Sequence, residues 1–192
     1  MASVSEDSKS TAILNSAFQA FATYGFRKTS MDDIAKGAGM SRPAVYLHYK
    51  NKEAIVRELT QFYYGEKTAM VTEALSGAGT LPQLLEQAIQ VQSRGMAEIL
   101  ASPHGLEMLD ATKSMSTDII QQGEAELTRI YADWLRREDA AGRAHLPVGP
   151  DEAAKTITAS LKGIKMTASS AEEFEQSISQ FATLMGAALE VR

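Results

Sequence analysis

Apolar residues recur at intervals of three and four positions along almost the whole chain, and this spacing restricts the fold more than any other feature. The first such set comprises Leu14, Ala17, Phe18 and Phe21. These side chains would share one face of a helix running from about Ser8 to Tyr24, because a helix turns once in 3.6 residues. No stretch alternates apolar and polar residues as a half-buried strand does. The pattern predicts an all-α protein of about nine helices.

Glycine, proline and capping residues indicate where the helices should begin and end. The segment from Ala141 to Pro150 contains two glycines and two prolines, so it is the clearest linker. Beyond the first helix, the spacing predicts helices over 31–37, 42–49, 52–75, 81–100, 115–135, 153–166 and 174–189.

Composition and charge narrow the class of protein. The 192 residues include no cysteine, and no apolar run approaches the roughly 18 residues that span a bilayer. The first ten residues are polar and include two acids, unlike a signal peptide, so we expect a cytoplasmic protein outside the membrane. The net charge of −5 is uneven, because residues 1–62 carry +2 and the remaining 130 residues carry −7. This asymmetry suggests that the two parts have different partners.

Two short predicted helices, over 31–37 and 42–49, are joined by a turn that contains glycine. Thr29 or Ser30 can cap the first helix, and Ser41 can cap the second. Two such helices with a short glycine-containing connection have the spacing of a helix-turn-helix.

A helix-turn-helix places its second helix in the major groove of DNA, where the N-terminal residues meet base edges. Ile34, Ala35 and Val45 should face inward and leave the other side of the second helix free. Arg42 lies at the start of that helix, and arginine commonly makes two hydrogen bonds to guanine. Phosphate contacts are expected from Thr29 or Ser30, Tyr46, Tyr49 and Lys52.

Residues 25–53 read GFRKTSMDDIAKGAGMSRPAVYLHYKNKE. This stretch resembles the N-terminal DNA-binding domain of the TetR family of transcriptional repressors, and the resemblance extends from about Ile13 to Leu59. It implies an all-α homodimer in which three N-terminal helices bind DNA, while a C-terminal helical domain binds a ligand and forms the dimer. The implied domains are 1–51, with the helix-turn-helix at about 31–49, and 52–192.

By this resemblance, the DNA contacts come from the recognition helix, its entry and the start of the next helix. The expected residues are Thr29, Ser30, Ser41, Arg42, Pro43, Ala44, Tyr46, His48, Tyr49 and Lys52. Pro43 and Ala44 depart from the family, in which many members carry Gly or Thr, and Ala44 can make only apolar contacts such as one with a thymine methyl. The tyrosines, Arg42 and His48 have a simpler alternative as packed or solvated surface side chains.

The C-terminal part contains many methionine and aromatic residues, which suit a pliable apolar cavity. The inward faces of the helices over 81–100 and 115–135 are the best candidate walls, with His104, Glu107 and Asp110 as further polar groups that could orient a ligand. Each of these residues has ordinary core packing as its alternative. The expected pocket residues are Met70, Ile89, Gln92, Met96, Met108, Met115, Ile119, Tyr131 and Trp134.

The last two predicted helices carry long apolar stripes. A two-fold dimer would bury these stripes in a four-helix bundle made of two helices from each chain. Burial within one subunit is the alternative. The expected interface residues are Ile157, Leu161, Ile164, Phe174, Ile178, Phe181 and Met185.

A helical enzyme is the competing class, but the sequence gives it little support. His104 and Glu107 form only a single, reversed fragment of the paired Glu-x-x-His motifs that a di-iron bundle requires. No glycine-rich phosphate loop or nucleophile motif is present, so we expect no enzymatic activity, no cofactor and no metal.

The favoured function is a sequence-specific, DNA-binding transcriptional regulator. It would be a repressor that a small apolar or amphipathic ligand releases from a palindromic operator. A regulator controlled by a partner protein, or an activator without a ligand, stays open. A fully packed C-terminal core would favour these alternatives, and an open pocket would favour the ligand-controlled repressor.

Overall fold

The computed structural model describes the backbone of residues 2–189 and the side chains of residues 8–189. This part of the chain contains ten helices and no strand, so the all-α prediction is confirmed. Every helix in it is too short or too polar to cross a bilayer. The helices are α1 (Ala2–Tyr24), α2 (Met31–Gly37), α3 (Arg42–His48), α4 (Lys52–Leu75), α5 (Leu81–Ser93), α6 (Met96–Ala101), α7 (Gly105–Met115), α8 (Thr117–Ala140), α9 (Pro150–Thr167) and α10 (Ala171–Leu189).

Two helix breaks were not predicted. The segment 81–100 forms α5 and α6 rather than one helix, with Arg94 and Gly95 between them. The predicted helix 115–135 begins at Thr117 as α8, after a break at Ser116, and the preceding helix α7, which ends at Met115, had no predicted counterpart. Ser116, between these helices, is fully buried, and its hydroxyl hydrogen-bonds the Thr60 hydroxyl at 3.2 Å.

The chain divides into two compact units. The first comprises the chain up to Tyr63 together with Ile99–Ile120, and the second comprises Tyr64–Glu98 and the chain from Gln121 onward. Helices α4, α6 and α8 each contribute residues to both units. This division by contacts differs from the predicted functional boundary after residue 51, which stays a prediction.

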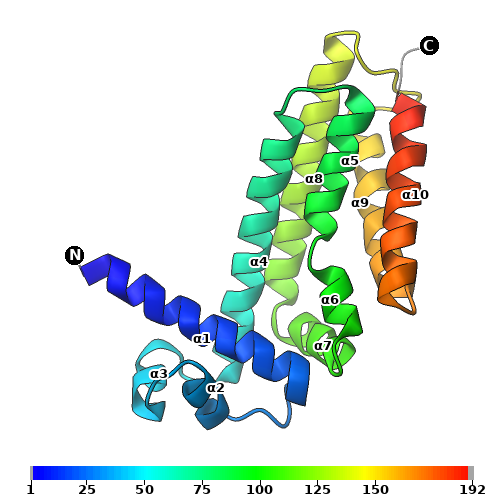
Figure 1. The fold of residues 1–192 in the computed structure, drawn as a ribbon. Coiled ribbons are helices and arrows are strands. Elements are labelled where there is room, and N and C mark those ends of the chain that lie inside the picture. Colours follow the sequence, from blue (N-terminus) through cyan, green and yellow to red (C-terminus); the bar gives the residue numbers. More distant parts are fainter. Residues whose placement is uncertain (1, 190–192) are drawn as a thin grey trace. The chain divides into compact units, whose positions relative to one another are not determined.

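The first unit has a core shared by α1, α2, α3 and the beginning of α4. Ile13, Phe21, Ile34, Val45 and Ile55 are all at most 1% exposed. The predicted inward orientation of the apolar residues in α2 and α3 is therefore confirmed. Helix α1 packs against α2, which in turn packs against α3 (Figure 1).

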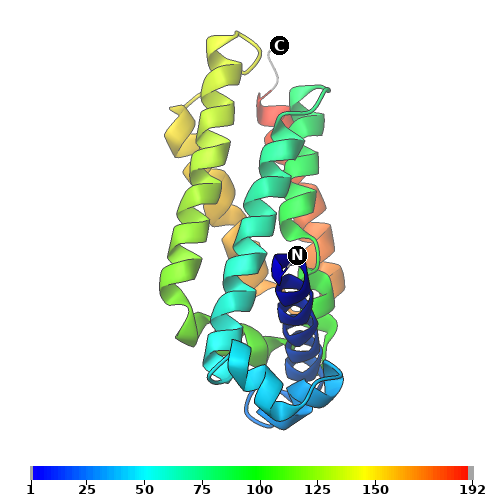
Figure 2. The same cartoon turned by 90° about the vertical axis from the view of Figure 1, so that its left-hand side faces the viewer.

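The second unit is a bundle in which α10 packs along both α5 and α9. These helices run in the same general direction as the parts of α4 and α8 that belong to this unit (Figures 1 and 2). The largest fully buried side chains of the unit include Trp134, Tyr131, Leu85, Ile89 and Ile157.

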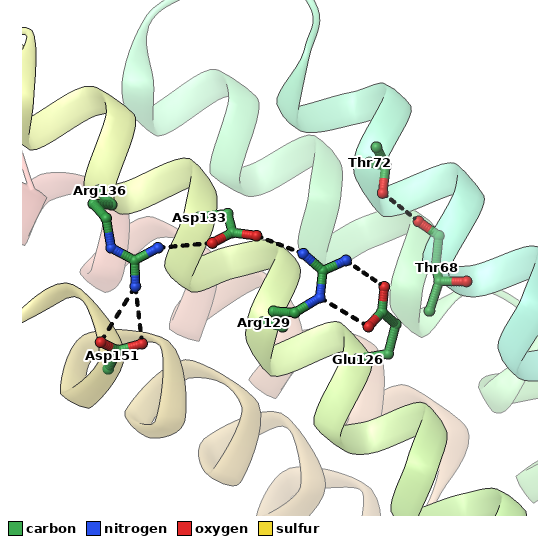
Figure 3. Close-up of polar contacts among 7 residues, drawn as sticks. All are labelled: Thr68, Thr72, Glu126, Arg129, Asp133, Arg136 and Asp151. Carbon is green, nitrogen blue, oxygen red and sulfur yellow. Dashed lines mark hydrogen bonds and ion pairs between the residues drawn. The ribbon is translucent and has the colours of Figure 1, made fainter.

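A chain of charged side chains follows the outer face of α8 and reaches α9 (Figure 3). Arg129 bonds both carboxylate oxygens of Glu126 and, at 2.6 Å, Asp133. Arg136 bonds Asp133 at 2.7 Å and Asp151 of α9 at 3.1 Å. All five side chains are at least 41% exposed, so solvent screens each pair and the network adds little stability per bond.

Candidate nucleic-acid interface

Helix α2 begins at a well-formed cap. The Ser30 Oγ accepts the Asp33 backbone N–H at 3.2 Å, and the Asp33 carboxylate accepts the Ser30 backbone N–H at 2.9 Å. The Ser30 hydroxyl, which donates to the same carboxylate at 2.6 Å, and the Ser30 backbone N–H hold the pKa of Asp33 below its ordinary value. Of the two predicted caps, Ser30 is the one that caps the helix, as a reciprocal capping box.

The turn between α2 and α3 fixes how the two helices meet. Gly39 has a φ of +66°, which side chains other than glycine rarely adopt, and the Met40 N–H donates to the Ala35 carbonyl at 2.9 Å. Ser41 then caps α3, because its Oγ accepts the Ala44 N–H at 3.3 Å. The predicted helix-turn-helix is therefore present, with both helices capped by the chain itself.

Helix α3 has one buried face and one face open to solvent. Val45 is fully buried, whereas Arg42, Pro43 and Tyr46 are exposed. The Arg42 guanidinium donates to the Tyr46 hydroxyl at 3.4 Å and lies 5.5 Å from the centre of the Tyr46 ring. The open face therefore presents a cation, an aromatic hydroxyl and apolar surface.

Leu47 belongs to the same open face and was missing from the predicted contacts. It is 87% exposed, an unusual position for a leucine. The sequence spacing could have predicted this exposure. Leu47 follows the inward-facing Val45 by two residues, which is about 200° around a helix and so places Leu47 on the opposite side. Leucine can contact a thymine methyl in the major groove.

Two of the predicted phosphate contacts come from buried side chains. The Thr29 side chain is only 2% exposed, and its hydroxyl donates to the Gly25 carbonyl at 2.8 Å and the Ala20 carbonyl at 3.2 Å. Tyr49 is also buried, and its hydroxyl hydrogen-bonds the Ser10 hydroxyl at 2.5 Å. Both hydroxyls form hydrogen bonds inside the first unit, so the structure does not support either of them as a phosphate contact.

The remaining predicted DNA contacts lie at or near the surface. Ser30, Ser41, Arg42, Pro43 and Tyr46 are exposed, and Ala44, His48 and Lys52 are half-buried. Lys52 differs from the others because its ammonium group already donates two hydrogen bonds to main-chain carbonyls of the first unit.

The nine predicted pocket residues do not all belong to one unit. Met108, Met115 and Ile119 lie in the first unit, where Met108 is part of the core and Met115 packs against it. The other six lie in the second unit, where the Tyr131 hydroxyl donates to the Gln92 carbonyl oxygen at 2.8 Å. Burial raises the pKa of Tyr131 far above its ordinary value.

Trp134 is the unusual member of this group. It is 1% exposed, and its indole Nε1–H has no hydrogen-bond partner within the described part of the chain. Buried donors are rarely left without an acceptor.

His104, Glu107 and Asp110, which were predicted to orient a ligand, lie in the first unit, where His104 and Glu107 form hydrogen bonds to neighbouring segments. The His104 backbone N–H donates to the Ala22 carbonyl at 3.1 Å, and its Nδ1 lies 3.1 Å from a Glu107 carboxylate oxygen. Glu107 also accepts the Arg27 backbone N–H at 3.2 Å, which helps to hold its pKa below the ordinary value. Asp110 is exposed. Helix α7 is thereby fastened to the end of α1.

A cleft of about 880 Å³ opens in the second unit. The connection between α4 and α5, from Leu75 to Leu84, lines one side, and Arg137, Glu138 and Arg143 line the other. None of the nine predicted pocket residues lines this cleft. Glu138 is buried and bound by Arg143 through bonds of 2.6 and 3.0 Å, which lower its pKa.

The predicted dimer residues fall into two groups. Ile157, Leu161, Phe174 and Ile178 are at most 6% exposed within the single chain, so the subunit's own core already covers them, and their place in an interface stays a prediction. Ile164, Phe181 and Met185 are half-buried. The large exposed apolar side chains of α9 and α10 are instead Met166 and Leu184, at 65% and 71%.

The chain resembles known regulators in sequence and in fold. Residues 13–59 match the family described as bacterial regulatory proteins, tetR family. YdgC of Bacillus subtilis, an uncharacterized HTH-type transcriptional regulator, is 24% identical over 176 residues, which cover 84% of this chain and 86% of YdgC. The HTH-type transcriptional repressor Rv1474c of Mycobacterium tuberculosis is 28% identical over 163 residues, which cover 79% of each chain.

Among solved structures, the fold is similar to that of SmeT, the repressor of the Stenotrophomonas maltophilia multidrug efflux pump SmeDEF. The TM-score is 0.72 at 19% identity, with 95% of this chain and 90% of SmeT covered. A complex of SmeT with triclosan gives a TM-score of 0.68 at 20% identity, with 95% and 92% covered. The helix-turn-helix domain of this chain, matched over residues 13–59, is therefore that of the TetR family of bacterial regulatory proteins, and the fold of the chain as a whole is similar to that of the repressor SmeT.

Proposed function

We propose that this protein is a repressor that binds a palindromic operator as a homodimer and is released by a small apolar or amphipathic ligand. The observation that carries the proposal is the open face of α3, held in place by the Ser30 and Ser41 caps and by the buried Val45. A recognition helix needs such a rigid base, because base contacts depend on fixed geometry.

On this face, Arg42 is the residue suited to guanine, and Leu47 is suited to a thymine methyl. Tyr46 can bond a phosphate through its hydroxyl, since the Arg42 bond to it is long at 3.4 Å. Pro43 and Ala44 are small enough to let the helix approach the bases.

A homodimer is supported by the apolar surface that α9 and α10 leave exposed. Met166 and Leu184 are large apolar side chains in contact with solvent, and Ile164, Phe181 and Met185 are only half-buried. Such surface favours association, and a two-fold dimer would match the symmetry of a palindrome. Leu184→Glu should turn a dimer into a monomer in sedimentation velocity, whereas Leu106→Glu, at an exposed leucine of α7, should not.

A ligand is supported by two features of the second unit. The cleft of about 880 Å³ lies in the size range of small-molecule sites, and its lining combines three leucines with the polar side chains of Ser76, Thr80, Arg137, Glu138 and Arg143, which suits an amphipathic ligand. Trp134 offers a buried N–H without an acceptor. Triclosan, found with SmeT, is a natural first probe in a thermal-shift screen. A ligand that raises the melting temperature and weakens operator binding would support release, and one that stabilises without weakening DNA binding would contradict it.

The DNA proposal is tested by selecting bound sequences from random duplex DNA. We expect an enriched palindrome whose two halves have their centres about one helical turn apart, or a multiple of it. Lys155→Ala, which removes an exposed lysine of α9, serves as a matched control that should enrich the same palindrome. Recovery of no common sequence by the wild-type protein would refute operator binding.

A further inference from the structure

The loop between α1 and α2 is held by an ammonium group from a distant part of the chain. The Nζ of Lys52, the first residue of α4, donates to the Phe26 and Thr29 carbonyls, both at 2.6 Å. It also lies 4.4 Å from the centre of the Phe26 ring, within the range of a cation–π contact. Two of the three N–H donors of the Lys52 ammonium group therefore bond this loop.

Other contacts fix the same loop from inside the first unit. The Thr29 hydroxyl donates to the Gly25 carbonyl at 2.8 Å, and Glu107 of α7 accepts the Arg27 backbone N–H at 3.2 Å. A connection of only six residues is thus bonded at several of its main-chain groups, and its shape is closely determined.

This loop carries two adjacent cations, Arg27 and Lys28. Both side chains are exposed, and neither forms an ion pair with any side chain among residues 8–189. The nearby acids are occupied, because Asp32 pairs with Lys36 at 3.0 Å and Asp33 caps α2 through Ser30. The loop therefore presents two exposed cations immediately before the helix-turn-helix, and the Glu107 carboxylate, which accepts the Arg27 backbone N–H, offsets part of their charge.

We propose that the α1–α2 loop is a second DNA-contacting surface, on which Arg27 and Lys28 bind backbone phosphates, and that Lys52 is the positioning residue that holds this surface. The inference rests on the proposed operator binding. The proposed role of Lys52 differs from the predicted phosphate contact, because its ammonium group holds the loop and does not itself bind DNA. Cations held in fixed positions beside a recognition helix bind phosphates and release counterions without reading sequence.

The first test removes the two cations. Operator binding by the full-length protein is measured by fluorescence anisotropy over a series of salt concentrations. The double variant Arg27→Ala/Lys28→Ala should lower the slope of log affinity against log salt by about 3 to 4 for a dimer, since each phosphate contact contributes roughly 0.9. The control, Lys113→Ala/Lys155→Ala, removes two exposed lysines and should keep the wild-type slope. A double variant with the wild-type slope would overturn the loop as a contact surface.

The second test asks whether Lys52 acts through the loop. Lys52→Met should weaken operator binding roughly ten-fold in the wild-type protein and less than about two-fold in the Arg27→Ala/Lys28→Ala protein, because the cations it positions are already gone. Lys52→Arg, which keeps a cationic donor, should restore most of the affinity. If Lys52→Met lowers the salt slope by about 2 in both backgrounds, Lys52 itself binds phosphate and the positioning role is wrong.

Thermal unfolding of each variant checks that its fold is retained, and Lys52→Arg carries the test if Lys52→Met does not fold. Wild-type affinity of Lys52→Arg while Arg27 and Lys28 are present supports the proposal. A further loss of affinity on adding Lys52→Arg to the Arg27→Ala/Lys28→Ala protein contradicts it, because no cations are left to position. A wild-type protein that selects no DNA sequence would instead overturn the proposed function.

Discussion

Replacing Thr29 by valine would remove a hydroxyl from the junction of α1 and α2 while keeping a branched side chain of similar size. The single hydroxyl proton is shared between the Gly25 carbonyl at 2.8 Å and the Ala20 carbonyl at 3.2 Å, and the residue is 2% exposed. A buried hydrogen bond contributes a net of about 0.5–1.5 kcal/mol. The Gly25 carbonyl keeps a second donor, the Thr29 backbone N–H at 3.1 Å, so its loss is only partial.

From these bonds we expect Thr29→Val to lower the free energy of unfolding by about 1–2 kcal/mol. For a chain of this size, the melting temperature should fall by about 2–4 °C per kcal/mol. Thr29→Ser keeps the hydroxyl and should lose less. The measurement is thermal unfolding followed by circular dichroism, with operator affinity measured well below the melting temperature.

Because the hydroxyl faces the interior, operator affinity of folded Thr29→Val should stay within about three-fold of wild type, less than the loss of one good hydrogen bond. The opposite pattern would refute the reasoning. A Thr29→Val protein that melts like wild type but binds all DNA sequences about ten-fold more weakly would show that this hydroxyl reaches a phosphate.

Three other outcomes follow from the structure. Arg42→Ala should cost about 1–3 kcal/mol of operator affinity at one symmetric base pair, measured with operators altered at each position; an equal loss on every sequence would instead make Arg42 a phosphate contact. Gly123→Ala should destabilise the protein by about 1–3 kcal/mol in chemical denaturation, because a Cβ there would lie 2.2 Å from the Tyr64 ring; unchanged stability would mean that the ring moves aside at no cost. Arg143 lowers the pKa of Glu138 below its ordinary 4.5, so their bond stabilises the fold above that pH and is lost as the pH falls through the lower pKa of the folded state. Between pH 6 and pH 3 the melting temperature should therefore fall less steeply for Glu138→Gln than for wild type.

Local sequence rules predicted the parts of the site that depend on near neighbours. Ser30 and Ser41 cap α2 and α3 because a hydroxyl at that position can accept an N–H three residues later. Ile34 and Val45 are buried because helical spacing alone places them on the inner face. These relations involve few residues, so they can be read from the chain.

Contacts between distant segments could not be read in this way. The hydroxyls of Thr29 and Tyr49 could bond a phosphate as well as they bond a protein group. Only the fold shows that Thr29 meets the Ala20 carbonyl and that Tyr49 meets the Ser10 hydroxyl. The stripe that includes Ile157 has the same spacing whether it is buried in its own bundle or in a partner. Periodicity shows that a face needs covering, and the three-dimensional arrangement decides what covers it.

Because Leu47 is exposed, binding by the recognition helix should release water from an apolar side chain. In the free protein this side chain is 87% exposed, so the solvent around it is released only when another surface covers α3. Covering apolar surface lowers the heat capacity of a complex. The open face of α3 combines a leucine with an arginine, so its binding enthalpy should change with temperature. The affinity of such a face for DNA therefore depends on temperature differently from that of a surface that binds through charges alone.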